Sequence, residues 1–156
     1  MKHIFFSCAL SLVSLLAFAQ TAQMVKDAEA IQNTLDNLSK AWNLHDAKAY
    51  SMEFSEDADF TNVRGMSTYG RDSIAIFHKK PFATMFSASK IKITGKRIRF
   101  LTTDIAAVDS WWEMTGAKTP DGKDVPLRKG LLNVVMTRDG EHWLITVMHN
   151  MDLPVN

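Results

Sequence analysis

The sequence predicts an α+β domain in which helices come first and long antiparallel strands follow. Apolar residues recur at four- and three-residue steps through Ile31, Leu35, Leu38 and Trp42, the pattern of an amphipathic helix. From Lys90 onward the pattern changes to alternating and apolar strands separated by turn signals. Helical segments followed by a run of strands are typical of an α+β arrangement, with the helices gathered on one side of a sheet.

The beginning of the chain has the three parts of a secretory signal peptide. A short basic start at Lys2 is followed by an apolar run over residues 4–16 and by Ala17-Phe18-Ala19, whose small residues suit a signal peptidase. The apolar run is shorter than the ~20 residues that a membrane-spanning helix needs. We therefore expect a signal peptide over residues 1–19 and a single periplasmic or secreted domain over residues 20–156.

The charge balance and the cysteine content limit the partners of this domain. The chain has 18 basic and 17 acidic residues, and loss of Lys2 leaves 17 of each sign. A near-neutral domain lacks the basic face that nucleic acid requires and gives no reason to expect an anionic membrane surface as partner. Cys8, the single cysteine, leaves with the signal peptide. The domain then forms no disulfide and depends on its hydrophobic core.

Two helices are expected at the start of the domain. The apolar stripe predicts the first over residues 26–44, with Asp27 and Glu29 suited to its positive N-terminal end. Asp46 is the expected N-cap of a second, shorter helix. Ala47, Tyr50 and Phe54 would lie along one face of that helix.

A short β-like segment and a third helix come next. Residues 59–62 favour a strand, and Gly65 and Gly70 bracket a turn or small hairpin. The third helix opens near residues 71–72, and Pro81 is expected to kink or end it. Its apolar stripe carries Ile74, Phe77 and His78.

The second half of the domain is predicted to be a series of strands. The expected segments are 91–93 with 98–100, then 105–115, 131–138 and 143–150. A polar loop over residues 118–126 contains the turn signal Asp121-Gly122, and Asp139-Gly140 is a strong hairpin signal.

The last hairpin predicts a second subunit. If Asp139 and Gly140 are the two turn residues, Arg138 faces Glu141 and Asn133 faces Thr146. One face then carries Leu132, Val134, Met136, Trp143, Ile145, Val147 and His149. The other carries Leu131, Asn133, Val135, Leu144, Thr146, Met148 and Asn150. Both faces are largely apolar, so the face that the helices do not cover needs another cover. We expect a homodimer through the sheet.

Four segments together resemble a known family. They are residues 41–46 (AWNLHD), residues 54–60 (FSEDADF), residues 65–74 with Gly70-Arg71-Asp72, and the closing strand from Trp143 to Asn150. Their order and the helices-then-sheet layout resemble the nuclear transport factor 2-like superfamily, and within it the SnoaL-like branch with its SgcJ/EcaC-like sequences. The resemblance covers nearly all of residues 20–156, and its motifs are specific for the fold rather than for a function.

The resemblance implies a cystatin-like cone, a barrel formed by a curved antiparallel sheet wrapped around three N-terminal helices. It also implies an interior pocket and frequent dimerisation across the sheet. In ketosteroid isomerases of this superfamily, the position similar to Asn62 holds the aspartate that acts as general base. An amide cannot take up a proton in that role, although Asn62 could hold a carbonyl or hydroxyl group by a hydrogen bond.

Asp59 and His78 are the candidate catalytic residues. Asp59 follows the second helix, where it could act as a displaced base, or it could cap a turn and face water. His78 lies on the apolar stripe of the third helix and therefore points inward. It could exchange protons with a ligand, or it could be a core histidine bonded to a backbone carbonyl.

Five further residues are expected to bind the substrate. Trp42, Tyr50 and Trp112 would wall the pocket, and Trp112 is the inward member of the adjacent Trp111-Trp112 pair. Simple packing is the alternative for both tryptophans of that pair. Asn62 and His149 would orient the substrate.

The expected function is binding of a small, mostly apolar molecule in an interior pocket, with or without cofactor-independent acid–base chemistry of an isomerase, cyclase or hydratase type. The alternative is a non-catalytic binding or assembly module. The sequence contains no metal-binding, nucleophile or nucleotide-binding signature, so no metal and no cofactor are expected.

The first prediction concerns export. Intact-mass analysis or N-terminal sequencing of the protein made in its host should find a chain that begins at Gln20. A cytoplasmic protein that retains Met1 would contradict the predicted signal peptide.

Overall fold

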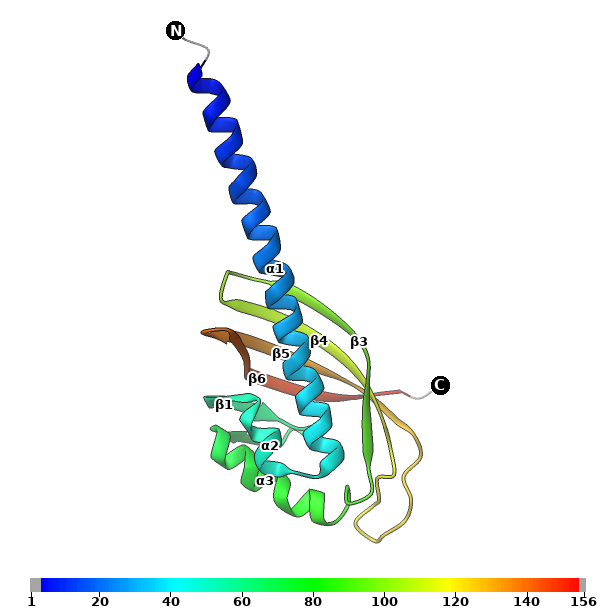
Figure 1. Cartoon of the computed structure of the whole chain (residues 1–156). Coiled ribbons are helices and arrows are strands. Elements are labelled where there is room, and N and C mark those ends of the chain that lie inside the picture. Colours follow the sequence, from blue (N-terminus) through cyan, green and yellow to red (C-terminus); the bar gives the residue numbers. More distant parts are fainter. Residues whose placement is uncertain (1–3, 155–156) are drawn as a thin grey trace.

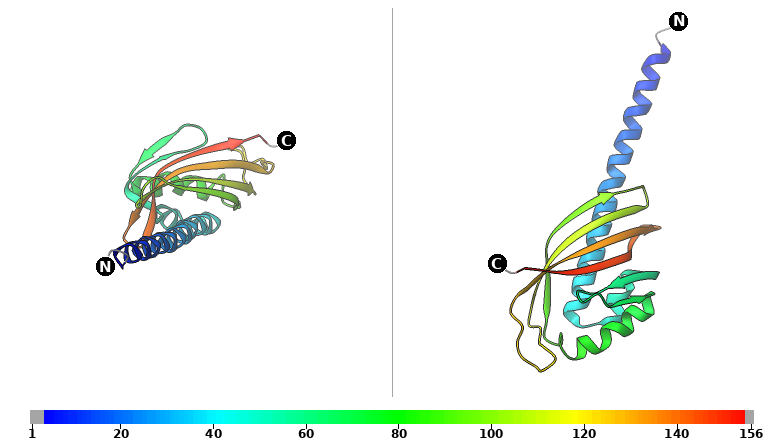
Figure 2. Two further views of the ribbon diagram at one scale, coloured as in Figure 1. Left: turned by 90° about the horizontal axis from the view of Figure 1, so that it is seen from above. Right: turned by 180° about the vertical axis from the view of Figure 1, so that it is seen from behind.

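A computed structural model describes residues 4–154 of the chain, and the side chains of residues 20–154. The helices are α1 (Ile4–Leu44), α2 (Ala47–Met52) and α3 (Arg71–Ala83). The strands are β1 (Phe54–Thr61), β2 (Ser67–Tyr69), β3 (Lys90–Phe100), β4 (Ile105–Thr115), β5 (Arg128–Asp139) and β6 (His142–Leu153). The predicted α+β class, with helices on one side of a curved sheet, is confirmed (Figures 1 and 2).

The six strands form one sheet in the order β2-β1-β6-β5-β4-β3. Strands β3 to β6 pair with their neighbours in antiparallel fashion, as expected. Strand β1 instead pairs in parallel with β6, so the predicted purely antiparallel sheet is corrected to a mixed one. The parallel pair is possible because β1 and β6 are far apart in the sequence and no tight turn joins them.

Helix α1 lies along the inner face of the sheet, while α2 and α3 gather at one end near β1 (Figures 1 and 2). The predicted apolar stripe of α1, formed by Ile31, Leu35, Leu38 and Trp42, is buried against the sheet, as the periodicity indicated. The helix begins at Ile4 rather than near residue 26, and its first part extends beyond the sheet. In the part of the chain that the structure describes, no helix is long and apolar enough to cross a membrane.

The N-cap predicted for the second helix is confirmed, whereas Phe54, expected on a face of that helix, begins β1 instead, and Pro81 does not end the third helix. The Asp46 carboxylate accepts hydrogen bonds from the backbone N–H groups of Lys48 and Ala49, which caps α2. In α3, Pro81 neither ends the helix nor falls in its middle, because the helix continues to Ala83. A proline in the last turn removes only one intrahelical donor, so the helix tolerates it.

The hairpin between β5 and β6 has a different register from the predicted one. Asp139 pairs with His142, so Gly140 and Glu141 form the turn. A β-bulge then follows, because Met136 pairs with Ile145 whereas Val135 pairs with Val147. The extra residue in β6 is Thr146, and its hydroxyl shares a hydrogen bond with Thr137.

The bulge reverses the predicted facing of the end of β6. One added residue shifts the alternation of side chains by one position. Met148 therefore turns into the core with Trp143 and Ile145, while His149 is exposed on the outer face. Asn133 faces His149 instead of Thr146, and its amide donates to Asp109.

A buried carboxylate ties α1 to the β5–β6 hairpin. Asp27 accepts a hydrogen bond of 3.0 Å from the indole Nε1 of Trp143. The guanidinium of Arg138 lies 3.6 Å from the same carboxylate and also pairs with Asp104. Because Trp143 and Arg138 both bind the Asp27 carboxylate, this contact holds α1 against the β5–β6 hairpin.

Candidate ligand pocket

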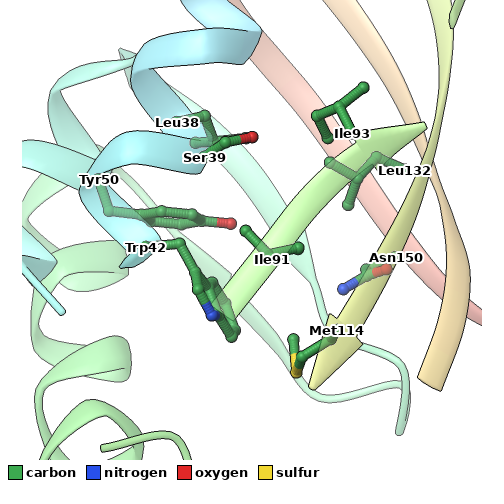
Figure 3. A pocket seen from close by; sticks show the side chains of 9 residues that line it. All are labelled: Leu38, Ser39, Trp42, Tyr50, Ile91, Ile93, Met114, Leu132 and Asn150. Carbon is green, nitrogen blue, oxygen red and sulfur yellow. The ribbon is translucent and has the colours of Figure 1, made fainter. Parts of the chain in front are cut away.

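A pocket lies between α1, α2 and the inner face of the sheet (Figure 3). Its lining residues come from six elements and are Leu38, Ser39, Trp42, Tyr50, Ile91, Ile93, Met114, Leu132 and Asn150. The free cavity has a volume of about 20 Å³, which is room for about one water molecule. The pocket is thus largely filled by its own apolar side chains.

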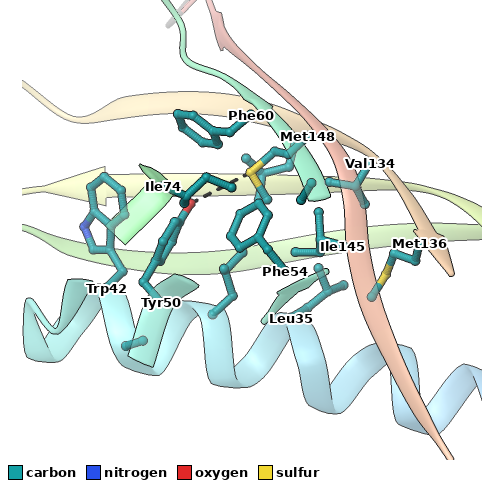
Figure 4. Close-up of a cluster of buried hydrophobic side chains, with 14 of the residues drawn as sticks. Leu35, Trp42, Tyr50, Phe54, Phe60, Ile74, Val134, Met136, Ile145 and Met148 are labelled. Carbon is teal, nitrogen blue, oxygen red and sulfur yellow. Dashed lines mark hydrogen bonds between the residues drawn. The ribbon is translucent and has the colours of Figure 1, made fainter. Parts of the chain in front are cut away.

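Tyr50 supplies the first polar group of the pocket. The N-cap at Asp46 sets the start of α2 and so places Tyr50 one turn further along, facing inward. Its hydroxyl donates only to the thioether sulfur of Met148, at 3.8 Å, which is a weak acceptor (Figure 4). Burial raises the pKa of the Tyr50 hydroxyl above its ordinary value, so the group stays protonated and remains a donor.

Asn150 supplies the second polar group. Its Oδ1 accepts a hydrogen bond of 2.9 Å from the indole Nε1 of Trp112. Because an indole N–H can only donate, the oxygen of the amide must face Trp112. The amide nitrogen then points into the pocket, where no atom of the described residues accepts from it (Figure 3).

Trp42 forms an apolar wall, as predicted. Its indole N–H donates to the hydroxyl of Ser89 at 3.0 Å, which satisfies the only polar atom of the ring. The ring meets that of Tyr50 edge to face, with 5.9 Å between the centroids. Trp42 and Tyr50 both lie among the residues that line this pocket.

His78 lies in the core and is not among the residues that line the pocket. Its Nδ1–H donates to the backbone carbonyl of Ile74 at 2.8 Å. The imidazole is surrounded by the rings of Trp42, Tyr50, Phe60, Phe77 and Phe82. Burial lowers its pKa to about 4, so the ring is neutral at physiological pH. This geometry matches the core-histidine alternative.

Asp59 and Asn62 do not reach the pocket. Asp59 is exposed on β1, while the next residue, Phe60, faces inward and contacts His78. Asn62 follows the strand, and its side-chain oxygen accepts from the backbone N–H groups of Arg64 and Met66. Asn62 therefore closes the turn between β1 and β2. The structure does not bring Asp59 and His78 together in a cavity.

Two other predicted residues have different outcomes. Trp112 is buried on the inner side of β4, as expected, and acts on the pocket through its hydrogen bond to Asn150 rather than by lining it. His149 is exposed on the outer face, so its predicted pocket position is wrong. The β6 bulge is the physical reason for the exchange between His149 and Asn150.

The sequence-based prediction missed most of the lining. The missed residues are Leu38, Ser39, Ile91, Ile93, Met114, Leu132 and Asn150. The apolar periodicity identifies several of them as inward-facing but cannot say which border a cavity. No local signal separated Asn150 from His149, because both expected faces of the hairpin are largely apolar.

The polar groups of the pocket are neutral at physiological pH. The lining contains no aspartate, glutamate or histidine. Among the described side chains, no group of three or more His, Cys, Asp or Glu residues is placed to hold a metal ion. The arrangement is suited to hydrogen bonding of an uncharged molecule rather than to proton transfer.

Comparison with known proteins identifies the fold. Neither a family model nor a curated protein sequence matches the chain. A solved protein with a cystatin-like fold from Caulobacter vibrioides has a TM-score of 0.75 and 24% identity, covering 81% of this chain and 89% of its own. An NTF-2-like protein from Shewanella oneidensis has a TM-score of 0.65 and 23% identity, covering 80% and 98%.

A similar enzyme structure is also known. A hexachlorocyclohexane dehydrochlorinase from Novosphingobium barchaimii has a TM-score of 0.77 at 11% identity, covering 86% of this chain and 91% of its own. Identities of this size establish the fold and leave the activity open. The chain has the cystatin-like, nuclear transport factor 2-like fold, and the predicted resemblance to that superfamily is confirmed at the level of fold.

The second prediction concerns His78 and pH. Because its folded pKa of about 4 lies below the unfolded value of 6.5, the unfolded chain binds a proton first as the pH falls. The contribution of neutral His78 to stability is complete above pH 6.5. As the pH is lowered toward 4, the free energy of unfolding should therefore fall by up to about 3 kcal/mol. Denaturant unfolding across this range should show that His78→Leu removes this part of the slope. The matched variant His149→Leu should keep it, and equal slopes in wild type and His78→Leu would contradict the assignment.

Proposed function

We propose that the protein is an exported, SnoaL-like binding domain that holds a small, mostly apolar molecule through hydrogen bonds to a few polar side chains. The observation that carries the proposal is the convergence of the Tyr50 hydroxyl and the Asn150 amide nitrogen in an otherwise apolar pocket (Figure 3). Few polar groups among apolar walls are typical of small-molecule sites. The segment over residues 1–19 supports the proposal of a periplasmic or secreted location.

Binding without turnover fits the pocket better than acid–base catalysis does. A general base must lie within hydrogen-bond reach of the proton that it removes. The lining offers no carboxylate or imidazole, and burial keeps Tyr50 protonated. Asp59 faces water and His78 is enclosed by aromatic rings. The protein of similar structure from Novosphingobium barchaimii is a hexachlorocyclohexane dehydrochlorinase, which supports a small molecule as the class of ligand proposed for this chain.

A ligand must displace side chains to enter. The free volume of about 20 Å³ is too small for an organic molecule. Met114 lines the pocket, and the sulfur of Met148 accepts the hydrogen bond of the Tyr50 hydroxyl. Methionine is flexible and fills irregular space, so these two side chains can repack around an occupant at modest cost.

The third prediction tests the polar group on Tyr50. Tyr50→Phe should weaken binding of the probe cyclohexanone by roughly fivefold, because one hydrogen bond to the ligand is lost. Ligand-observed NMR titration measures the change. The fold should be retained, since the hydroxyl donates only to a thioether.

The chain provides a matched control for this experiment. Tyr69, the only other tyrosine, is exposed on β2, so Tyr69→Phe should bind cyclohexanone as the wild type does. An unchanged dissociation constant for Tyr50→Phe would argue against the proposed pocket.

We also propose a homodimer through the outer face of the sheet. Trp111 and Met151 are about two-fifths exposed there, and Leu131 lies half-buried between them in the same cross-strand row. A neighbouring row is polar and joins Asp109 to Asn133. An apolar row beside a fixed polar row is a surface that a twofold copy can cover.

The fourth prediction concerns this dimer. Light scattering at micromolar concentration should give twice the mass of one chain for the wild type and the mass of one chain for Trp111→Glu, because a buried unpaired carboxylate is costly. Met66→Glu, which changes an exposed apolar residue on the β1–β2 turn, should remain dimeric. A monomeric wild type would refute the proposed interface.

A further inference from the structure

We infer that Trp112 fixes the side-chain amide of Asn150 with its nitrogen toward the pocket, so that the pocket selects uncharged carbonyl compounds over alcohols. This inference rests on the proposed binding function and names the class of ligand. Trp112 acts here as a positioning residue, because it lies behind Asn150 and is not part of the lining.

The hydrogen bond between the two side chains has only one workable direction. The indole Nε1–H of Trp112 donates to Asn150 Oδ1 at 2.9 Å, and Trp112 is almost fully buried. Rotation of the amide by half a turn would place its NH₂ group against the indole N–H. Two donors would then face each other, and a buried N–H would lose its partner.

The indole itself is held in place by its surroundings. Gly130 pairs with Trp112 on the neighbouring strand, and a Cβ atom there would lie 2.0 Å from the indole ring. The same Cβ would lie 2.4 Å from the backbone oxygen of Met151. Glycine is therefore required at position 130 for the indole to lie flat on β5.

A cation also lies over the indole ring. The guanidinium of Arg128 lies 5.6 Å from the ring centroid of Trp112. Arg128 is in turn paired with Asp152 at 2.6 Å. The indole has little freedom to move, and the orientation of the Asn150 amide is fixed before any ligand enters.

The fixed amide and the Tyr50 hydroxyl give the pocket two donors that can meet on one oxygen, while its acceptors are the hydroxyl oxygens of Tyr50 and Ser39 and the weak thioether of Met148. A carbonyl oxygen has two lone pairs and can accept from both the Tyr50 hydroxyl and the Asn150 amide nitrogen. An alcohol can also accept, but its own proton finds chiefly the thioether of Met148 or the hydroxyl of Ser39. A carboxylate would lose its hydration, and no lysine or arginine lines the pocket to compensate.

The first arm of the test needs no ligand. Nitrogen-15 NMR of the full domain follows the side-chain NH₂ signals of Asn150 and the indole N–H of Trp112. The wild type should show one NH₂ pair and a slowly exchanging indole proton. Trp112→Phe should broaden or double the Asn150 pair, whereas Trp111→Phe, on the outer face, should leave it unchanged. An unchanged Asn150 pair in Trp112→Phe overturns the inference.

The second arm compares cyclohexanone with cyclohexanol by ligand-observed titration. The wild type should bind the ketone severalfold more tightly, and Trp112→Phe should bring this ratio close to one. Asn150→Asp keeps an acceptor for Trp112 but presents an oxygen to the pocket, so it should lose the ketone and retain the alcohol. Equal binding of both probes by the wild type overturns the inference, while binding of neither overturns the proposed function itself.

Discussion

The bulge at Thr146 in β6 is the constraint on which the pocket depends. It adds one residue to the strand between Ile145 and Val147, and from that point the side chains exchange faces. Met148 reaches the core and lies against the Tyr50 hydroxyl, and Asn150 reaches the inner face beside Trp112. Without the extra residue, Val147 would lie in the place of Met148, and His149 would lie in the place of Asn150. Both polar groups of the pocket therefore owe their setting to one irregularity in a central strand.

The interior around this pocket is built from rings and from fully paired polar atoms. Trp42, Tyr50 and His78 meet one another and the neighbouring phenylalanines, and each ring nitrogen that donates finds an oxygen within the fold. Such an interior excludes water and leaves little room to spare. Tyr50 differs from the other buried donors because a thioether is the weakest of the available acceptors. The Tyr50 hydroxyl and the Asn150 amide nitrogen keep unused hydrogen-bonding capacity at the pocket, and among the buried side-chain polar atoms of the described residues the Ser110 hydroxyl has no partner.

A hexachlorocyclohexane dehydrochlorinase has a similar fold, and in this chain the lining of the pocket contains no aspartate, glutamate or histidine. Acid–base chemistry needs an ionisable group whose pKa suits the working pH and whose position reaches the substrate. The Asp59 side chain is exposed to solvent on the outer side of β1. The pKa of His78 is lowered by its burial among aromatic rings. The polar residues that line the cavity are Ser39, Tyr50 and Asn150, which carry a hydroxyl, a phenol and an amide. The chemistry available there is recognition through hydrogen bonds in a dry, apolar setting.

The sequence by itself determined the local structure of this protein. The stripe from Ile31 to Trp42, the N-cap at Asp46 and the bounds of β4 follow from side-chain periodicity and capping, which act over a few residues. Only the tertiary structure decided the β6 bulge, the parallel pairing of β1 with β6 and the separation of Asp59 from His78. Strand register and pairing are set by contacts between segments far apart in the chain, and a one-residue shift in register reverses every later side chain. The pocket residues from Ile91 to Asn150 could therefore be recognised as a group only once the sheet was assembled.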